Sequence, residues 1–380
     1  MGLKQNIWAT PAEHLRLTRP DHPVIYAAPR RIQSAARRFV DGFPGQVSYA
    51  VKANPEAVMV SNLAAAGVWA FDVASPDEMA LVRAAVPQAA LHYNNPVRST
   101  EEIARAVELG VVSYAVDSFS ELDKLMAALP RTAEIAVRFK LPVKGAVYDF
   151  GGKFGAPPEK AAALLRRVGA AGFRASITFH PGTQCNDPRA WATYIAEAAR
   201  ISDKAGVPLA RLNVGGGFPS HREGGRAPAL GPIFAAIGQA ARAAFGPEGP
   251  ALLCEPGRAL AAEGVALATR VKALRDGGDV FLNDGIYGGL AEAPLMGRID
   301  RIAVLDPAGA PRCGAPVERV LFGPTCDSLD RLPGVLRLPG DMAEGDYILF
   351  FGMGAYSTAT ATRFNGYGAL EKAVVLGLQP

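Results

Sequence analysis

Short apolar runs alternate with longer helix-like stretches between residues 47 and 264, and this alternation limits the folds open to the chain. Stretches rich in alanine and leucine, such as PEKAAALLRRVGAAG, separate the runs and have helical spacing. The eight apolar runs are QVSYAVKA, VWAFDVAS, ALHYNN, VVSYAVDS, EIAVRFKL, ASITFHPG, RLNVGGGF and ALLCEPGRAL. Strands that alternate with helices indicate parallel pairing through helical crossovers. The pattern therefore predicts an α/β fold, a (β/α)8 barrel over residues 33–265.

The sequence pattern changes after residue 265, where helical spacing is replaced by short strand-like runs separated by turns that contain Gly, Pro and Asp. The new runs are VALATRVKAL, VFLNDGIYGG, ERVLFGPTC and DYILFFGMGAYS. They predict a separate C-terminal β domain over residues 266–380. Part of the N-terminal segment, residues 1–32, contains the strand-like run PVIYAAP, which we expect to join that domain. A chain of 380 residues is long enough for two such domains.

Composition excludes several classes of protein. The net charge is only +4 and no basic run stands out, so we expect no nucleic-acid partner. No apolar segment is long enough to span a bilayer and the N-terminus lacks a signal-peptide core, so we expect a cytoplasmic protein with no membrane partner. No CxxC pair occurs, which argues against a metal site or a disulfide framework. The four cysteines are Cys185, Cys254, Cys313 and Cys326.

Lys52 lies in the run SYAVKANP, between the apolar residues Val51 and Ala53. A charged ammonium group is costly in such a run unless it loses its proton or finds a partner. In one interpretation the lysine ends a strand and its amine reaches solvent. In the other, the amine is kept neutral at a barrel strand end, ready to form an imine with a carbonyl cofactor.

Other polar residues also fall at the ends of predicted barrel strands, where enzymes of this fold gather their catalytic groups. They are Asp72, Asn94, Arg138, His180, Gly215, Gly216, Gly217 and Glu255. The three glycines in NVGGGFP let backbone N–H groups approach an anion such as a phosphate, although a flexible turn is the alternative. The run lacks the spacing of a dinucleotide-binding motif.

Two of these strand ends carry groups suited to a flat, charged ring. In CEPGRAL, Glu255 could pair with Arg258, or it could hold a proton on a ring nitrogen of a pyridine cofactor. His180 in TFHPGTQC is either structural or stacked on such a ring.

The predicted β domain carries further candidates. In FGPTCDSLD, Cys326 could donate a proton and Asp327 could bind an amine, whereas the alternative is an ordinary loop. Tyr356 follows two glycines in FGMGAYS and offers a phenol to a phosphate oxygen, or it covers a domain interface.

Seven motifs together resemble the pyridoxal-phosphate-dependent decarboxylases of the alanine-racemase-like fold, the ornithine/diaminopimelate/arginine decarboxylase family. In order along residues 48–367 they are YAVKANP, FDVAS, HPGTQC, GGGFP, EPGR, GPTCDSLD and GAYSTATATRFNGY. The motif GPTCDS is most similar to the ornithine/lysine branch. The resemblance implies fold type III, pyridoxal 5'-phosphate as cofactor, a role in polyamine biosynthesis and a homodimer with shared active sites.

The resemblance also implies a role for each matching residue. Lys52 would carry the cofactor as an imine, His180 would stack on its ring and Glu255 would pair with the ring nitrogen. Cys326 would protonate the carbanion that remains after carbon dioxide is lost, and Asp327 would bind a distal amine of the substrate. Both residues would act in the active site of the partner subunit. Asp72, Glu78 and Arg138 would support Lys52 and the cofactor. The residues implied to hold the phosphate and its surroundings are Thr183, Gly215, Gly216, Gly217, Gly257, Arg258 and Tyr356.

The substrate expected from this branch is a basic L-amino acid, ornithine or lysine, which would give a diamine and carbon dioxide. The branch usually has a second acidic residue near Leu295 and Met296, where this chain has none. The candidates to replace it are Glu292 and Asp300.

Two arginines near the same place, Arg298 and Arg301, suit a carboxylate instead. The alternative substrate is therefore a carboxylate-bearing amine such as diaminopimelate, carboxynorspermidine or a siderophore precursor. The candidate substrate-binding residues are therefore Asp327, Arg298 and Met296. An alternative of another class is a non-catalytic regulator similar to the antizyme inhibitors, which the presence of Lys52 and Glu255 disfavours.

Overall fold

The computed structural model describes residues 7–142, 152–222, 224–297 and 299–379. The chain divides into two compact units. The barrel unit comprises Ala36–Pro219 and Pro228–Gly257, and the β unit comprises Met1–Ala35, Ser220–Ala227 and Arg258–Pro380. The predicted fold class, a (β/α)8 barrel with a separate β domain, is confirmed.

Eight parallel strands close into the barrel, and each lies in one of the eight apolar runs of the sequence, except that β8 begins one residue earlier, at Arg174. Closure is made by β10 against β3, where Leu253 pairs with Gln46. The strands are β3 (Gln46–Ala50), β4 (Ala70–Asp72), β5 (Ala90–Tyr93), β6 (Val111–Val116), β7 (Glu134–Arg138), β8 (Arg174–Thr178), β9 (Arg211–Asn213) and β10 (Ala251–Cys254). Their residues are mostly buried, as expected for strands covered on both faces.

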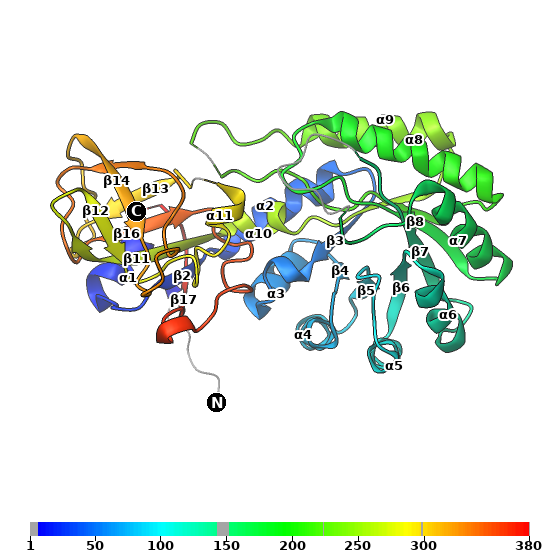
Figure 1. Cartoon of the computed structure of the whole chain (residues 1–380), viewed down its shortest axis with the longest axis horizontal. Coiled ribbons are helices and arrows are strands. Elements are labelled where there is room, and N and C mark those ends of the chain that lie inside the picture. The colour runs from blue at the N-terminus through cyan, green and yellow to red at the C-terminus, as the bar shows by residue number, and fades with distance from the viewer. Residues whose placement is uncertain (1–6, 143–151, 223, 298, 380) are drawn as a thin grey trace. The chain divides into compact units, whose positions relative to one another are not determined.

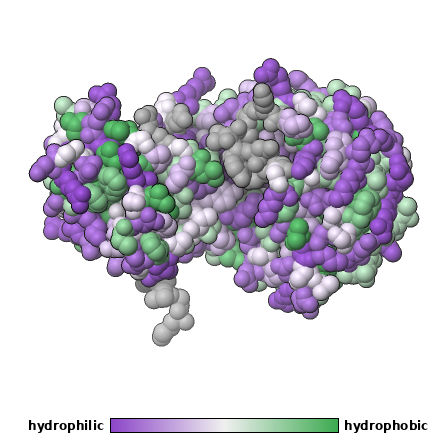
Figure 2. All heavy atoms as spheres, in the orientation of Figure 1, coloured by the Kyte–Doolittle hydropathy of each residue, from purple (hydrophilic) through white to green (hydrophobic). Residues whose placement is uncertain are grey.

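Helices lie outside the strands, and hydrophilic side chains predominate over them on the face shown (Figures 1 and 2). Several begin where a serine precedes a glutamate by three residues: the Ser75, Ser99 and Ser118 side chains accept from the third backbone N–H of their helices. The helices are α2 (Pro29–Gly42), α3 (Ala57–Ala65), α4 (Pro76–Ala85), α5 (Thr100–Glu108), α6 (Phe119–Ala128), α7 (Pro158–Ala170), α8 (Pro188–Ala205) and α9 (Gly231–Phe245).

A buried polar network links several barrel strands. Arg211 Nη1 lies 3.1 Å from His92 Nε2, and because arginine only donates, the other ring nitrogen of His92 carries the proton toward Ser48 Oγ, 3.0 Å away. Burial, followed by the charge of Arg211, lowers the pKa of His92 to about 3, so this histidine is neutral. Arg211 also lies 3.4 Å from Glu134. These partners explain a core histidine without any part in catalysis.

The β unit contains a nine-stranded sheet. Strand β2 (Val24–Ala27) pairs with β11 (Val265–Leu274) on one side and with β17 (Glu371–Val375) on the other. The remaining strands are β1 (Ile7–Trp8), β12 (Asp279–Leu282), β13 (Ile302–Leu305), β14 (Pro316–Phe322), β15 (Leu336–Pro339) and β16 (Tyr347–Phe351). Short helices complete the unit, namely α1 (Pro11–Thr18), α10 (Arg258–Ala261) and α11 (Ala293–Met296).

The core of the β unit is built across these pairings, with Leu15, Tyr26, Ala266, Leu349 and Val375 packed in one cluster. In the described ranges, no helix is both long and apolar enough to cross a membrane.

Candidate active site

A cavity of about 210 Å³ opens in the barrel unit where the strands end. Its walls include six residues that we expected at strand ends, namely Lys52, Asp72, Asn94, Arg138, His180 and Glu255. They come from β3, β4, β5, β7, β8 and β10 or from the residues directly after these strands. The parallel barrel thus brings together side chains that lie up to 203 residues apart in the sequence. In enzymes with this fold, catalytic groups generally gather at the same end of the barrel.

Lys52 does not lie in strand β3, which ends at Ala50. A single 3₁₀ turn, Val51–Ala53, follows the strand, buries Val51 and Ala53, and leaves 52% of the Lys52 side chain exposed. The strand therefore ends two residues before the lysine, which we expected at the strand end itself. The turn points the amine into the cavity, where Nζ lies 3.4 Å from Oδ2 of the buried Asp72.

Glu255 is a buried carboxyl group whose Oε1 accepts hydrogen bonds from the side-chain amides of Asn94 and Asn213. Burial, followed by the charge of Asp72, raises the pKa of Glu255 to about 7, while Lys52 oppositely favours the ionised form. A carboxyl group with this pKa can hold or release a proton near neutral pH. Sequence reasoning missed Asn213, although it lies two residues before Gly215, at the end of β9.

His180 is held as a neutral ring. The backbone N–H of Gly182 donates to His180 Nδ1 at 3.0 Å, so Nδ1 carries no proton. Burial, and after it the charges of Arg138 and Lys52, lowers the pKa of His180 well below its usual value. A neutral aromatic ring beside the cavity is suited to stacking on a flat ligand.

The glycine run is a tight backbone contact and not a flexible turn. A Cβ atom on Gly215 would lie 2.1 Å from the Phe179 carbonyl oxygen, and one on Gly217 would lie 2.0 Å from that of Gly182. Both glycines have positive φ, 69° and 83°. The run therefore packs against the loop after β8, which contains Thr183, and leaves no room for side chains. A Cβ on Gly216 would likewise lie 2.6 Å from the Glu255 carbonyl oxygen.

Three more predicted residues of the barrel unit surround this centre. Glu78 Oε2 accepts from the Ala74 N–H at 2.7 Å, and burial raises its pKa to about 7. Arg138 lies with its guanidinium carbon 5.2 Å from the ring centre of Phe154, another residue of the cavity wall, and burial lowers its pKa. A Cβ atom on Gly257 would lie 3.0 Å from that of Ala53, which favours glycine there.

In the β unit, Arg258 and Tyr356 lie together, with the guanidinium carbon 5.0 Å from the centre of the tyrosine ring. Both Nη atoms of Arg258 donate to the carboxylate of Glu292, with Nη2 2.6 Å from Oε1. Tyr356 has a left-handed backbone with φ 61°, which is uncommon for a residue other than glycine. Sequence reasoning proposed both residues for phosphate binding but did not foresee the Glu292 contact.

Cys326 and Asp327 are presented on the loop after β14. The Cys326 thiol and backbone N–H both donate to Asn365 Oδ1, at 3.2 and 3.1 Å, and the residue is exposed. Asp327 accepts from the Tyr287 hydroxyl and from the Leu329 N–H, and these bonds lower its pKa. Asp327 is therefore negatively charged at neutral pH and able to bind a cation.

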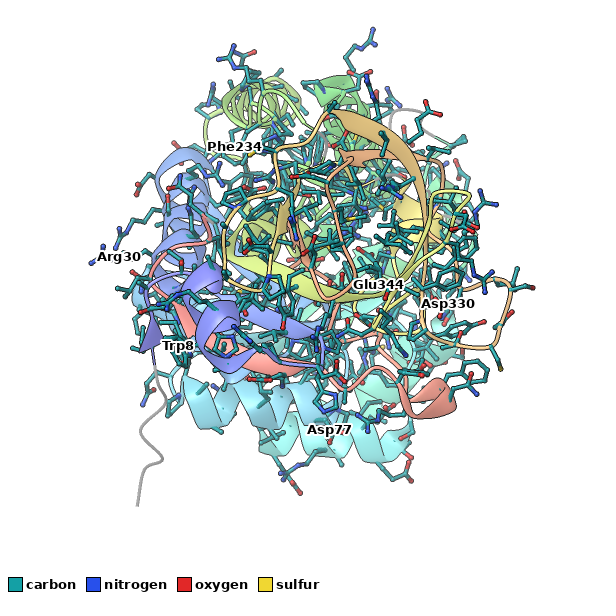
Figure 3. All side chains as sticks on the ribbon, turned by 90° about the vertical axis from the view of Figure 1, so that its left-hand side faces the viewer. Trp8, Arg30, Asp77, Phe234, Asp330 and Glu344 are labelled. Atoms are coloured by element: carbon teal, nitrogen blue, oxygen red, sulfur yellow. The ribbon has the colours of Figure 1, made fainter. Side chains whose placement is uncertain are left out.

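Asp330, labelled in Figure 3, fixes this loop and was not singled out from the sequence. Its carboxylate is 1% exposed and accepts from the Ile286 N–H at 2.9 Å, and from the Thr325 N–H and hydroxyl at 3.0 and 2.7 Å. A Cβ atom on Gly285 or on Gly323 would lie 2.1 Å from the carboxylate. The two glycines thus make room for a carboxylate that joins the loops after β12 and β14.

The candidates near α11 are mostly engaged by other groups. Arg301 donates to Glu263 at 2.8 Å and to the His221 carbonyl oxygen at 2.6 Å. Asp300 accepts from the Gly224 N–H at 2.6 Å. Met296 is the last residue of α11 and is partly buried. Arg298 lies outside the described residues.

The barrel unit fits pyridoxal phosphate by four of its own features. Lys52 offers an amine in the cavity, Glu255 offers a buried acid that can release its proton near neutral pH, and His180 offers a neutral ring. The run from Gly215 to Gly217 has no room for side chains, so an anion can approach its backbone closely.

Fold and cavity together define a barrel enzyme of the pyridoxal-phosphate-dependent class. The family model described as "Pyridoxal-dependent decarboxylase, pyridoxal binding domain" matches residues 29–262, and the chain belongs to this family. The expected cofactor and the expectation of an amino-acid decarboxylase are confirmed, and the non-catalytic alternative is set aside.

Known proteins match over most of the chain. The lysine/ornithine decarboxylase of Selenomonas ruminantium is 33% identical over 84% of this chain and 81% of its own length. The ornithine decarboxylase of Cricetulus griseus is 31% identical over 87% of this chain and 75% of its own. The Paramecium bursaria Chlorella virus arginine decarboxylase structure has a TM-score of 0.85 at 25% identity, covering 95% of this chain and 98% of that one. The Vibrio vulnificus lysine/ornithine decarboxylase complexed with putrescine has a TM-score of 0.80 at 28% identity, covering 95% and 96%.

Proposed function

We propose that this enzyme decarboxylates ornithine or lysine to a diamine and carbon dioxide, as a homodimer with shared active sites. The observation that carries the proposal is Asp327, a charged carboxylate that Tyr287 and Leu329 hold in place. A carboxylate of this kind suits the distal ammonium group of a basic amino acid. The relatives named lysine/ornithine decarboxylase and the structure complexed with putrescine support the same substrate class.

Bound pyridoxal phosphate would supply an electron sink for the bond that releases carbon dioxide. In the proposal, Lys52 holds the cofactor by its amine, and Asp72 lies 3.4 Å away to orient that amine. Glu255 would pair with the ring nitrogen: it would transfer its proton to that nitrogen and, as the resulting carboxylate, keep the nitrogen protonated, which a pKa of about 7 permits. His180 would offer a neutral ring for stacking on the cofactor.

Cys326 donates the proton that replaces the lost carboxylate. Its thiol is exposed and oriented by the hydrogen bond to Asn365 Oδ1, as a positioned general acid requires. Following the family resemblance, Cys326 and Asp327 act in the site of a second copy of the chain, so two copies are needed for one complete site.

The substrate proposal favours an amine over an additional carboxylate at the distal end. Glu292 is engaged by Arg258, which leaves Asp327 as the acid proposed for the distal amine. Arg301 is engaged by Glu263, so the carboxylate-bearing substrates lose one of their two candidate arginines. The partly buried Met296 adds apolar surface beside the chain segment where other members carry a second acid.

The substrate is tested by carbon dioxide release from L- and D-ornithine, L-lysine, L-arginine, meso-diaminopimelate and carboxynorspermidine. We expect release from L-ornithine or L-lysine and a visible absorbance band that the Lys52→Ala variant lacks. Asp327→Asn keeps the shape but removes the charge, and should raise KM for the basic substrate about 10- to 100-fold. Carbon dioxide release only from the carboxylate-bearing compounds would refute ornithine and lysine as the substrates. An absorbance band without release from any compound would still support the cofactor assignment.

The shared site is tested by mixing two inactive variants, Lys52→Ala and Cys326→Ala. If sites are shared between two copies, mixed dimers contain one intact site and activity returns on mixing. If each chain holds a complete site, the mixture stays inactive. Sedimentation of the same mixture checks that dimers form.

A further inference from the structure

Arg258 is held on two sides inside the β unit. Its side chain is 8% exposed and donates through both Nη atoms to Glu292, whose side chain is 16% exposed. The Tyr356 ring lies on another side of the guanidinium, 5.0 Å from its carbon. Among the described residues, the buried Nε–H of Arg258 has no hydrogen-bond partner.

The unpartnered Nε–H is the informative part of this arrangement. A bidentate carboxylate fixes the plane of a guanidinium and uses one N–H on each Nη atom. A buried donor without an acceptor is costly, so an acceptor from outside the chain is expected there. A phosphate oxygen is such an acceptor, and it matches the phosphate-binding role proposed for Arg258.

We propose that Glu292 is a positioning residue for cofactor phosphate binding. It fixes the guanidinium of Arg258 through the two Nη atoms and so keeps the Nε–H available to a phosphate oxygen. The inference rests on the proposed function, in which Arg258 binds the phosphate. It also assigns Glu292 a task other than substrate recognition, because both of its oxygens are occupied by Arg258.

The experiment compares two ligands that differ only in the phosphate. Cofactor-free Glu292→Gln and wild-type protein are titrated with pyridoxal 5'-phosphate and with pyridoxal, and binding is followed by the absorbance of the bound ligand. We expect the affinity for pyridoxal phosphate to fall about tenfold, as for other second-layer supports of a ligand site. The affinity for pyridoxal should change less than about twofold.

The control is Asp346→Asn, which breaks another bidentate pair of the same unit, Arg312 with the buried Asp346. It should lower the melting temperature without changing the ratio of the two affinities. Glu292→Asp keeps the charge and should keep most of the wild-type ratio of the affinities for pyridoxal phosphate and pyridoxal. This second variant can be measured even if Glu292→Gln fails to fold.

Three outcomes would overturn the inference. If Glu292→Gln lost affinity for pyridoxal phosphate and for pyridoxal to the same extent, the salt bridge with Arg258 would be merely structural. If Glu292→Gln bound pyridoxal phosphate more tightly than wild type, Glu292 would compete with the phosphate for Arg258. Wild-type protein that binds the two ligands equally would overturn the phosphate role of Arg258 itself. Because no substrate is present, these outcomes are independent of which amino acid the enzyme decarboxylates.

Discussion

Replacing Glu255 by glutamine should stabilise the cofactor-free protein at pH 8, although it removes a group that we place in catalysis. Burial and the Asp72 carboxylate raise the pKa of Glu255 from 4.5 to about 7 in the folded protein. Between these two values the folded protein holds a proton that the unfolded chain has already released. The stability contributed by this group is therefore full below about pH 4.5 and is lost as the pH rises toward 7.

The magnitude follows from the two pKa values. At pH 8 Glu255 is ionised in the folded protein, where it is buried near Asp72, and this lowers the free energy of unfolding by about 3 kcal/mol. At pH 5 the free energy of unfolding is lowered by less than about 1 kcal/mol. Glutamine has the same shape, and its Oε1 can still accept from Asn94 and Asn213, but it never ionises. Other titrating carboxyl groups, such as Glu78, contribute equally to both proteins and cancel in the difference.

The assay is urea unfolding of wild-type and Glu255→Gln protein, both free of cofactor, at pH 5 and pH 8. Protein concentration is kept constant because dimerisation would contribute to stability. Glu134→Gln is the control: it removes a buried carboxylate 3.4 Å from Arg211 and should destabilise the protein at both pH values. A Glu255→Gln protein no more stable than wild type at pH 8, or equally stabilised at pH 5, would refute this reasoning.

Two substitutions test other parts of the site. Gly217→Ala should cost about 2–4 kcal/mol and weaken cofactor binding, because its Cβ would lie 2.0 Å from the Gly182 oxygen at a φ of 83°. Gly231→Ala, where a Cβ meets nothing within 4 Å, is the control in the same titration and melting experiment, and equal effects would contradict the steric argument. Asp330→Asn should cost about 1–3 kcal/mol and lower turnover, because an amide cannot accept on both sides as the carboxylate does toward Thr325 and Ile286. A melting temperature and a turnover that both match wild type would contradict it.

The barrel was predictable because strands buried on both faces appear as continuous apolar runs between helical stretches. Most of the runs also carry a functional group at or just after the carboxyl end of their strand, so Asp72, His180 and Glu255 could be identified without any spatial information. The one local error concerns Lys52, where a 3₁₀ turn replaces the last residues of the expected strand. Asn54 and Pro55 indicate a turn there but do not say where the strand pairing stops.

The missed residues act across long separations in the chain. Asn213 donates to Glu255 42 residues away, Tyr287 to Asp327 40 residues away, and Asn365 accepts from Cys326 over 39 residues. Such contacts depend on how loops from different strands meet, and they leave no spacing in the sequence that periodicity could detect. For the same reason the contact of Arg258 with Glu292 was not foreseen, although both residues were noted separately.

The pairing of β2 with β11 and β17 has a consequence for how the chain is made. All barrel strands have been synthesised once residue 254 exists, but β2 waits for β11 and then, roughly 350 residues after its own synthesis, for β17. At ~5–20 residues per second on the ribosome, this last partner arrives about 20–70 s later. Val24–Ala27 is buried throughout in the finished sheet. During translation these four apolar residues therefore lack one or both of their partner strands until nearly the whole chain has been made.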